Sequence, residues 1–206
     1  MKEPIRIVVY SDYLCPWCYI AAVRLHELEK EYGNKINISW KSYPLVRQEI
    51  PDRLINPHSV DSRHRAALEE DKIRFSPWNH DKPYPSSSMP ALQAAKCAKL
   101  QGEEAFQKFH VALFKAFFVD GFNISESDVL ISIAKNTGLD VERFCSDLSR
   151  KSFEKEVLAE YEEGRAEYEG WGIPIVVVGG QYPITGAVPV ALYHRAIELC
   201  LASEIK

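Results

Sequence analysis

Residues 5–18 read IRIVVYSDYLCPWC, an apolar run that leads directly into two cysteines three positions apart. The run from Ile5 to Tyr10 is β-branched and apolar, which is typical of a buried strand. Pro16 follows the first cysteine and suits the first turn of a helix, where its missing N–H does no harm. We therefore expect Cys15 at a helix N-terminus, where unpaired N–H groups and the helix dipole favour a thiolate.

A thiolate in this position predicts disulfide exchange. Cys15 would attack a substrate disulfide, and Cys18, one turn further in, would resolve the mixed disulfide. Zinc is the rival chemistry, but a structural zinc site needs four ligands and the chain has one Cys-x-x-Cys knuckle. The other three cysteines are isolated on apolar helical faces, where packing is the simpler interpretation. They are Cys97, Cys145 and Cys200. We predict no metal site.

Length and charge narrow the class of protein. The 206 residues fit one large domain, or one domain with an inserted subdomain. A net charge of -4 and a pI near 5.9 argue against binding to nucleic acid or to an anionic membrane. No apolar stretch approaches the ~18 residues of a membrane span. The N-terminus does not resemble a signal peptide, so we expect a cytoplasmic protein.

The first forty residues predict a βαβ unit. Beyond the cysteine pair, apolar residues recur at helical spacing until Gly33-Asn34, which would end the helix. Residues 36–40 then alternate apolar and polar, as a second strand should. The two strands should be parallel, and the pair would lie at the carboxyl end of the first strand, where open α/β sheets carry their chemistry.

The middle of the chain is mostly helical in pattern. We expect a loop over residues 78–90, with Ser86-Ser87-Ser88 capping the helix that follows. Ser125 and Asp128 resemble a capping box. The helix after Ser86-Ser87-Ser88 should run to Leu100, and the other expected helices cover residues 58–75, 103–118, 125–138, 140–148 and 153–169.

The end of the chain predicts two strands and a helix. Ile173-Pro174 opens an apolar strand over residues 175–178, Gly179-Gly180 is a two-residue hairpin signal, and residues 181–185 return. A final helix over residues 190–200 follows. The fold class is therefore α/β, with a four-stranded mixed sheet and a long helical insertion. We place the domain core in residues 1–44 and 170–206, and the insertion in residues 45–169.

This element order, with Cys-x-x-Cys opening the first helix and a proline opening the hairpin, resembles the thioredoxin fold. The long helical insertion is similar to that of the DsbA-like thiol–disulfide oxidoreductases, and the chain resembles their FrnE-type branch most. The residues that carry this resemblance are Ser11-Asp12, Cys15-Pro16-Trp17-Cys18-Tyr19, Gly172-Ile173-Pro174, Gly179-Gly180, Gly186-Ala187 and Pro189.

The resemblance implies a protein disulfide oxidoreductase with Cys15 and Cys18 as its catalytic residues. It also implies a cis bond between Ile173 and Pro174, facing the cysteine pair and contacting substrate backbone, with Pro16 and Trp17 in the same substrate-binding region. The exchange needs no bound cofactor, and its partners would be protein or small-molecule thiols and disulfides, glutathione among them. Secreted members usually carry histidine where Trp17 stands, and an indole cannot supply imidazole's charge. We therefore expect a less oxidising pair.

Three further interpretations remain open from the sequence. The chain could be a glutathione-dependent isomerase or transferase of the same fold, although its two retained cysteines argue against this. It could also be a non-catalytic chaperone or binding module. Asp12 is either a proton acceptor for the buried thiol or a solvated turn residue. Neither the oligomeric state nor the direction of electron flow follows from the sequence.

Overall fold

The computed structural model describes residues 3–150 and 153–203, and its chain divides into two compact units. One unit combines Met1–Tyr43 with Glu160–Lys206 and contains the sheet, and the other is Pro44–Ala159. Residues 160–169, which the sequence pattern assigns to the insertion, therefore group with the sheet. They do so because the second half of helix α7 (Glu154–Glu167) packs on a strand of that sheet.

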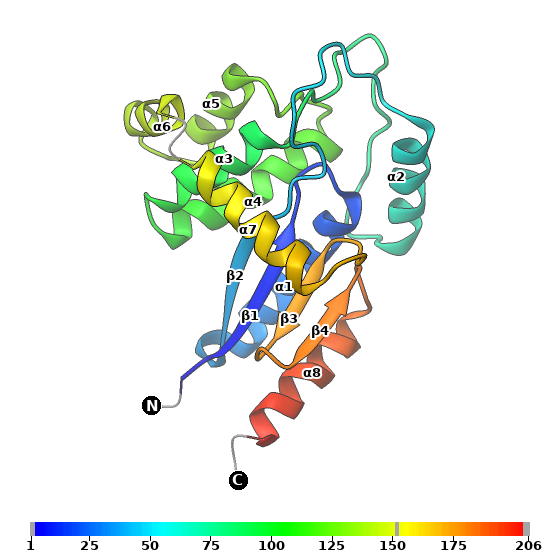
Figure 1. Cartoon of the computed structure of the whole chain (residues 1–206), viewed down its shortest axis with the longest axis vertical. Coiled ribbons are helices and arrows are strands. Elements are labelled where there is room, and N and C mark those ends of the chain that lie inside the picture. Colours follow the sequence, from blue (N-terminus) through cyan, green and yellow to red (C-terminus); the bar gives the residue numbers. More distant parts are fainter. Residues whose placement is uncertain (1–2, 151–152, 204–206) are drawn as a thin grey trace. The chain divides into compact units, whose positions relative to one another are not determined.

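The sheet unit contains the predicted four-stranded mixed sheet, in the order β2-β1-β3-β4. Its strands are β1 (Ile5–Ser11), β2 (Ile36–Ser42), β3 (Ile175–Val178) and β4 (Tyr182–Thr185). The β1–β2 pair is parallel, and the other two pairs are antiparallel. Figure 1 shows the late strands, in orange, beside the blue strand β1, so the central pairing joins the two ends of the chain.

One face of the sheet is covered by α1 (Pro16–Tyr32) and α8 (Val190–Ser203), and the short 3-10 helix Gly33–Lys35 leads from α1 to β2. Alternate residues of β1 point to this face, as the period of a strand requires. Arg24 of α1 donates hydrogen bonds to the carbonyl oxygens of Ala187 (3.1 Å) and Val188 (2.9 Å), which holds α1 to the turn before α8. The buried residues of this core are Ile5, Ile7, Val9, Leu25, Leu28, Ile36, Ile38, Val176, Val178, Tyr193, Ala196, Ile197 and Cys200.

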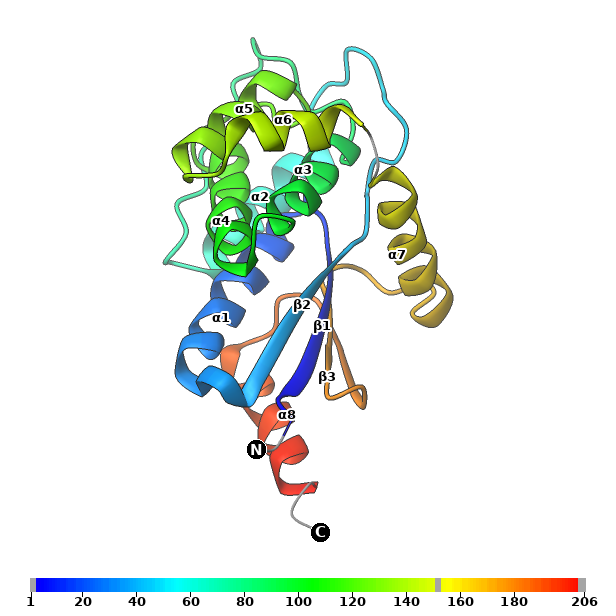
Figure 2. The same cartoon turned by 90° about the vertical axis from the view of Figure 1, so that its left-hand side faces the viewer.

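The opposite face of the sheet receives the second half of α7, which Figure 2 shows on the other side of the strands from α1. Gly164 lies against the ring of Tyr10, so closely that a Cβ there would be 2.7 Å from Tyr10 Cδ1. The Tyr10 hydroxyl donates to Glu163 Oε1 (2.9 Å), and Lys41 Nζ donates to both oxygens of the same carboxylate. The backbone N–H of Ser42 donates to Glu160 (2.7 Å).

The second unit is helical and has an aromatic core. Its helices are α2 (Pro57–Glu69), α3 (Met89–Lys99), α4 (Glu103–Phe118), α5 (Ser127–Asn136), α6 (Val141–Ser149) and the first turns of α7. The apolar face predicted for α4 is fully buried at Phe109, Leu113 and Phe117. No helix in the described ranges combines the length and hydropathy that a membrane span requires.

Two local expectations for this unit are wrong. The helix α2 ends at Glu69 rather than near residue 75, because Glu70 is extended and the chain beyond it bonds to α4 through Ser76 N and Phe118 O (2.8 Å). The capping box at Ser125 does not form. The Ser125 hydroxyl donates to Asn123 Oδ1 (2.6 Å), and Glu126 occupies the N-cap of α5 without a side-chain cap.

The contact between Gly164 and Tyr10 predicts that Gly164→Ala destabilises the protein, although Gly→Ala within a helix usually stabilises it. Helix propensity alone favours Gly→Ala by about 1 kcal/mol. Because the Tyr10 ring is buried and its hydroxyl is held by Glu163, we expect Gly164→Ala instead to lower the free energy of unfolding by about 1–3 kcal/mol. Urea denaturation followed by circular dichroism measures the change. In a Tyr10→Leu background the same substitution should no longer destabilise, and a loss of similar size in both backgrounds would contradict the contact.

Candidate active site

The turn between β1 and α1 places the first cysteine at the start of the helix. Cys15 is the N-cap residue of α1, with extended backbone angles (φ -95°, ψ 115°), and Pro16 occupies the first turn. The Cys15 N–H donates to the carbonyl of Asp12 (3.1 Å), while the Cys15 carbonyl accepts from the N–H groups of Cys18 (3.1 Å) and Tyr19 (3.3 Å). This bonding fixes the direction in which α1 leaves the sheet.

Cys18 lies one turn inside the helix and is fully buried, whereas Cys15 keeps 5% of its surface exposed. Burial raises the pKa of the Cys18 thiol well above its ordinary value, and the neighbouring Cys15 thiol raises it further. The Ser11 side chain and the Asp12 backbone act in the opposite direction, because both hydrogen-bond to the Cys18 sulfur. Cys18 is therefore the protonated, sheltered member of the pair at neutral pH.

The segment before β3 faces Cys15 from the other end of the chain. The peptide bond between Ile173 and Pro174 is cis, and Cys15 Sγ donates a long hydrogen bond to the Ile173 carbonyl (3.7 Å). The segment is held in turn by β4 and its end. Thr185 Oγ1 donates to the Gly172 carbonyl (2.7 Å), and Gly186 N donates to the Pro174 carbonyl (2.8 Å). The structure thus brings together Cys15, Cys18 and the Ile173-Pro174 bond.

The remaining candidate site residues differ in exposure. Pro16 is buried in the first turn of α1, and Trp17 beside it is half-buried. Asp12 is 1% exposed, so the expectation of a solvated turn residue is wrong. Its Oδ1 atom accepts from the N–H of Leu14 (2.8 Å), which shapes the turn into Cys15. The Asp12 carbonyl and the Ser11 hydroxyl were not foreseen as partners of the cysteines, because no local pattern indicates such contacts.

The other cysteines behave as packing residues. Cys97 and Cys200 are buried, and Cys145 is half-buried. Burial, assisted by Asp147, raises the pKa of Cys97 to about 12. Within the described ranges, no three residues among histidine, cysteine, aspartate and glutamate are grouped so that they could hold a metal ion.

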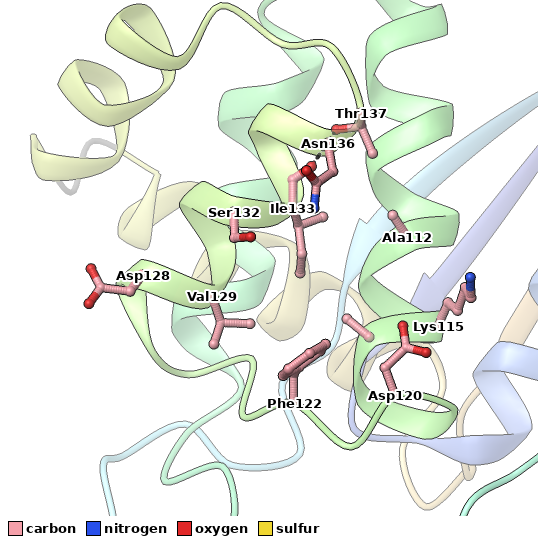
Figure 3. A pocket seen from close by; sticks show the side chains of 11 residues that line it. Ala112, Lys115, Asp120, Phe122, Asp128, Val129, Ser132, Ile133, Asn136 and Thr137 are labelled. Atoms are coloured by element: carbon pink, nitrogen blue, oxygen red, sulfur yellow. Dashed lines mark hydrogen bonds between the residues drawn. The ribbon is translucent and has the colours of Figure 1, made fainter.

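A separate cavity of about 420 Å³ lies within the helical unit, between α4 and α5. Figure 3 shows the ring of Phe122 and the side chain of Ile133 facing this space, with Lys115 and Asp120 at one side. All of its lining residues fall between Ala112 and Thr137, so it contains none of the thiol site. The candidate chemistry therefore belongs to the sheet unit and not to this cavity.

A thioredoxin-type sheet with a dithiol at the first helix and a cis-proline segment facing it defines a class of redox folds. The family model of the DSBA-like thioredoxin domain matches residues 6–198. The chain therefore belongs to the DsbA-like thioredoxin family, as the sequence motifs predicted.

Two relatives show how far sequence similarity extends. The ClpXP adapter protein SpxH of Bacillus subtilis is 31% identical over 154 residues, which are 73% of this chain and 50% of SpxH. The uncharacterized protein YwbO of the same organism is 24% identical over 200 residues, which are 94% of this chain and 96% of YwbO. The chain thus spans about half the length of this SpxH and of the SpxH of Halalkalibacterium halodurans.

Solved structures share the fold at low identity. A crystal structure from Nitrosomonas europaea, described as a candidate protein disulfide isomerase, has a TM-score of 0.82 at 18% identity and covers 98% of this chain and 99% of its own. The cytosolic disulfide reductase DsbM of Pseudomonas aeruginosa, solved with GSH, has a TM-score of 0.70 at 16% identity and covers 98% of this chain and 100% of its own. These likenesses show the fold.

The difference between the two thiols predicts an order of alkylation. A raised pKa leaves less thiolate at neutral pH, so N-ethylmaleimide at pH 7 should label Cys15 before Cys18 in the reduced protein. In a Cys15→Ser variant, labelling of Cys18 should still accelerate as the pH rises beyond 9.0, the ordinary thiol value. Peptide mass spectrometry after timed quenching gives both rates, with Cys145→Ser as the matched control. Earlier labelling of Cys18 would show that the assignment of roles is reversed.

Proposed function

We propose that this chain is a thiol–disulfide oxidoreductase that works through Cys15 and Cys18. The observation that supports this most is the arrangement of the pair. Cys15 Sγ lies 3.7 Å from the Ile173 carbonyl, Cys15 is 5% exposed, and Cys18, one helical turn further on, is fully buried. A nucleophile that keeps a small exposed surface, backed by a fully buried resolving thiol, fits the two steps of disulfide exchange.

In the reducing direction, the Cys15 thiolate attacks one sulfur of a substrate disulfide. A Cys15–substrate disulfide forms, and the other substrate sulfur leaves as a thiolate. Cys18 then loses its proton and attacks Cys15 Sγ, so that a Cys15–Cys18 disulfide forms and the second substrate thiolate leaves. Two electrons have passed from the pair to the substrate. An external thiol, such as glutathione, restores the dithiol by the same steps, and oxidation of a substrate runs them backwards.

The raised pKa of Cys18 fits its place in this sequence. A resolving thiol that stays protonated does not compete with Cys15 for the substrate. Its deprotonation is needed only after the mixed disulfide has formed, when the Ser11 hydroxyl and the Asp12 backbone can stabilise the developing negative charge. Substrate backbone would lie along the Ile173-Pro174 segment, next to Pro16 and Trp17.

We propose the reducing direction and a cytoplasmic setting. Trp17 stands between the cysteines and provides no imidazolium to stabilise a thiolate, which disfavours a strongly oxidising pair. The cytosolic disulfide reductase DsbM shares the fold along the whole chain and was solved with GSH, which supports glutathione as a partner. Assignment to the FrnE-type branch remains a prediction.

A redox titration tests the proposal. In glutathione buffers the Cys15–Cys18 pair should cycle between dithiol and disulfide, at a potential clearly below the roughly -120 mV of DsbA. Trp17→His should raise that potential, because an imidazolium stabilises the thiolate of the reduced form. Reduction of insulin disulfides should vanish in Cys15→Ser and persist in Cys145→Ser. A pair that never cycles would end the oxidoreductase proposal, and glutathione-dependent isomerisation that survives Cys15→Ser would favour the isomerase alternative.

A second candidate function is that of an adapter, and the 31% identity to SpxH favours it. Adapter function would need a binding surface and no disulfide exchange, so a variant without the two cysteines can distinguish the two proposals. We expect that purified ClpX binds the Cys15→Ser/Cys18→Ser double variant as well as the wild type, if the chain is an adapter. Surface plasmon resonance measures this binding. No binding by either protein would remove the adapter candidate and leave the thiol chemistry untouched.

A further inference from the structure

The carbonyl groups before β3 accept hydrogen bonds from donors of different kinds. The Gly172 carbonyl accepts from the Thr185 hydroxyl (2.7 Å), and the next carbonyl, that of Ile173, accepts from Cys15 Sγ (3.7 Å). The Pro174 carbonyl accepts from a backbone N–H just after β4 (2.8 Å). One of these bonds therefore comes from a side chain, one from the reactive thiol and one from the backbone.

The bond from Cys15 is the one that disulfide exchange removes. A sulfur donates only while it carries a proton, so the Cys15 thiolate, a mixed disulfide and the Cys15–Cys18 disulfide cannot make this bond. Among the described residues, Cys15 is the donor to the Ile173 carbonyl. During the exchange the segment is therefore held at its carbonyls by Thr185 and by the backbone bond at Pro174.

The chain just before Ile173 has little packing to hold it. Gly170 and Gly172 have no side chain, and a Cβ built at either would meet no atom within 4 Å. Trp171 between them is 39% exposed, although its N–H donates to the Tyr168 carbonyl (3.1 Å). Glycine loses more conformational freedom on ordering than any other residue. The peptide groups of this stretch are therefore oriented mainly by hydrogen bonds.

The bond from Thr185 acts directly on the backbone of Ile173. The Gly172 carbonyl and the Ile173 N–H belong to one planar peptide group, so a donor that fixes the carbonyl also fixes the direction of the N–H. The Ile173 side chain packs against the buried cluster that includes Tyr10 and Ile175. With its side chain packed and the peptide group before it held, Ile173 keeps both of its polar backbone groups in place.

Thr185 is well placed to hold this peptide group. It is the last residue of β4, and its backbone lies opposite Ile175 in the antiparallel pair. Its side chain is exposed, so burial in the core does not account for it. The side chain is β-branched, which restricts rotation about χ1 and keeps the hydroxyl oriented.

We propose that Thr185 is a positioning residue for peptide substrates, whose hydroxyl keeps the backbone of Ile173 in place for pairing with substrate backbone after Cys15 has lost its proton. This role rests on the thiol exchange proposed above. An extended peptide gains main-chain hydrogen bonds when it pairs with backbone that is already ordered, and ordering that backbone during binding would cost part of the gain. A disulfide without peptide groups gains nothing from an ordered Ile173.

Two disulfides with the same leaving group test this role in the reduced protein. One is a short peptide whose single cysteine is disulfide-linked to nitrothiobenzoate. The other is dithiobis-nitrobenzoate, which has no peptide group. In each case the Cys15 thiolate attacks one sulfur, a disulfide to Cys15 forms, and nitrothiobenzoate leaves from the other sulfur as a coloured thiolate. Stopped-flow absorbance gives the two rate constants, and their ratio isolates the contribution of the peptide backbone.

The variants at residue 185 should change this ratio only when the hydroxyl is lost. Thr185→Val keeps the shape and the strand preference of threonine. We expect it to slow the reaction with the peptide disulfide about three- to tenfold, the usual effect of one hydrogen bond, and to leave the reaction with dithiobis-nitrobenzoate unchanged. Thr185→Ser keeps the hydroxyl and should react with both disulfides as the wild type does.

Matched controls separate this role from a general loss of structure. Thr137→Val removes the hydroxyl of the other threonine, which donates to the Ile133 carbonyl (2.8 Å) in the helical unit, and it should leave both rates unchanged. Every protein carries Cys145→Ser, because that thiol is half-buried and would also react. The release that persists in Cys15→Ser is subtracted, and circular dichroism checks the fold of each variant.

The possible contrary results are distinct. Equal peptide rates in the wild type and Thr185→Val would overturn the role of Thr185 and leave the thiol proposal intact. Equal losses with both disulfides would also overturn it, because they would show an effect on Cys15 itself, and so would a Thr185→Ser variant as slow as Thr185→Val. Release by the wild type no faster than by Cys15→Ser would end the thiol proposal and this role together.

Discussion

The antiparallel pairing of β1 with β3 is the constraint on which the site depends. Its register sets Tyr10 opposite Ile175, and this brings the turn after β1 against the segment before β3. Cys15 and Ile173 are 158 positions apart in the chain, yet their sulfur and carbonyl oxygen are 3.7 Å apart. A slip of one residue would turn every side chain of β3 to the other face of the sheet. The register of this pairing therefore maintains the geometry of the thiol pair.

The two faces of the sheet contribute differently to this arrangement. The face under α1 and α8 is an apolar core, and it holds the helix whose N-terminus carries Cys15. The other face is aromatic and charged, where Tyr10, Lys41 and Glu163 form one hydrogen-bonded group. Lys41 lowers the pKa of Glu163 and keeps that carboxylate ionised. Tyr10 thus packs against α7 one residue before β1 ends at Ser11, whose side chain contacts Cys18.

Local patterns predicted the elements of the sheet unit well, because their signals are confined to short stretches. The run from Ile5 to Tyr10 and the Gly179-Gly180 turn are of this kind. The approach of Ile173 to Cys15 came from family resemblance, since no local pattern connects distant segments. Contacts that depend on tertiary packing were missed. Nothing near Gly164 in the sequence indicates that the ring of Tyr10 packs against it and leaves no room for a side chain.

During synthesis, strand β1 is made long before β3, the strand that pairs with its second edge. On the ribosome, β1 and β2 emerge early, whereas β3 follows only after the whole helical unit, Pro44–Ala159, has been made. At about 5–20 residues per second, that interval is on the order of ten seconds. The helical unit is continuous in sequence and can fold as it emerges, while one edge of β1 stays open and Cys15 lacks the carbonyl of Ile173. The nascent chain thus passes through a stage in which its two thiols are present but their site is unfinished.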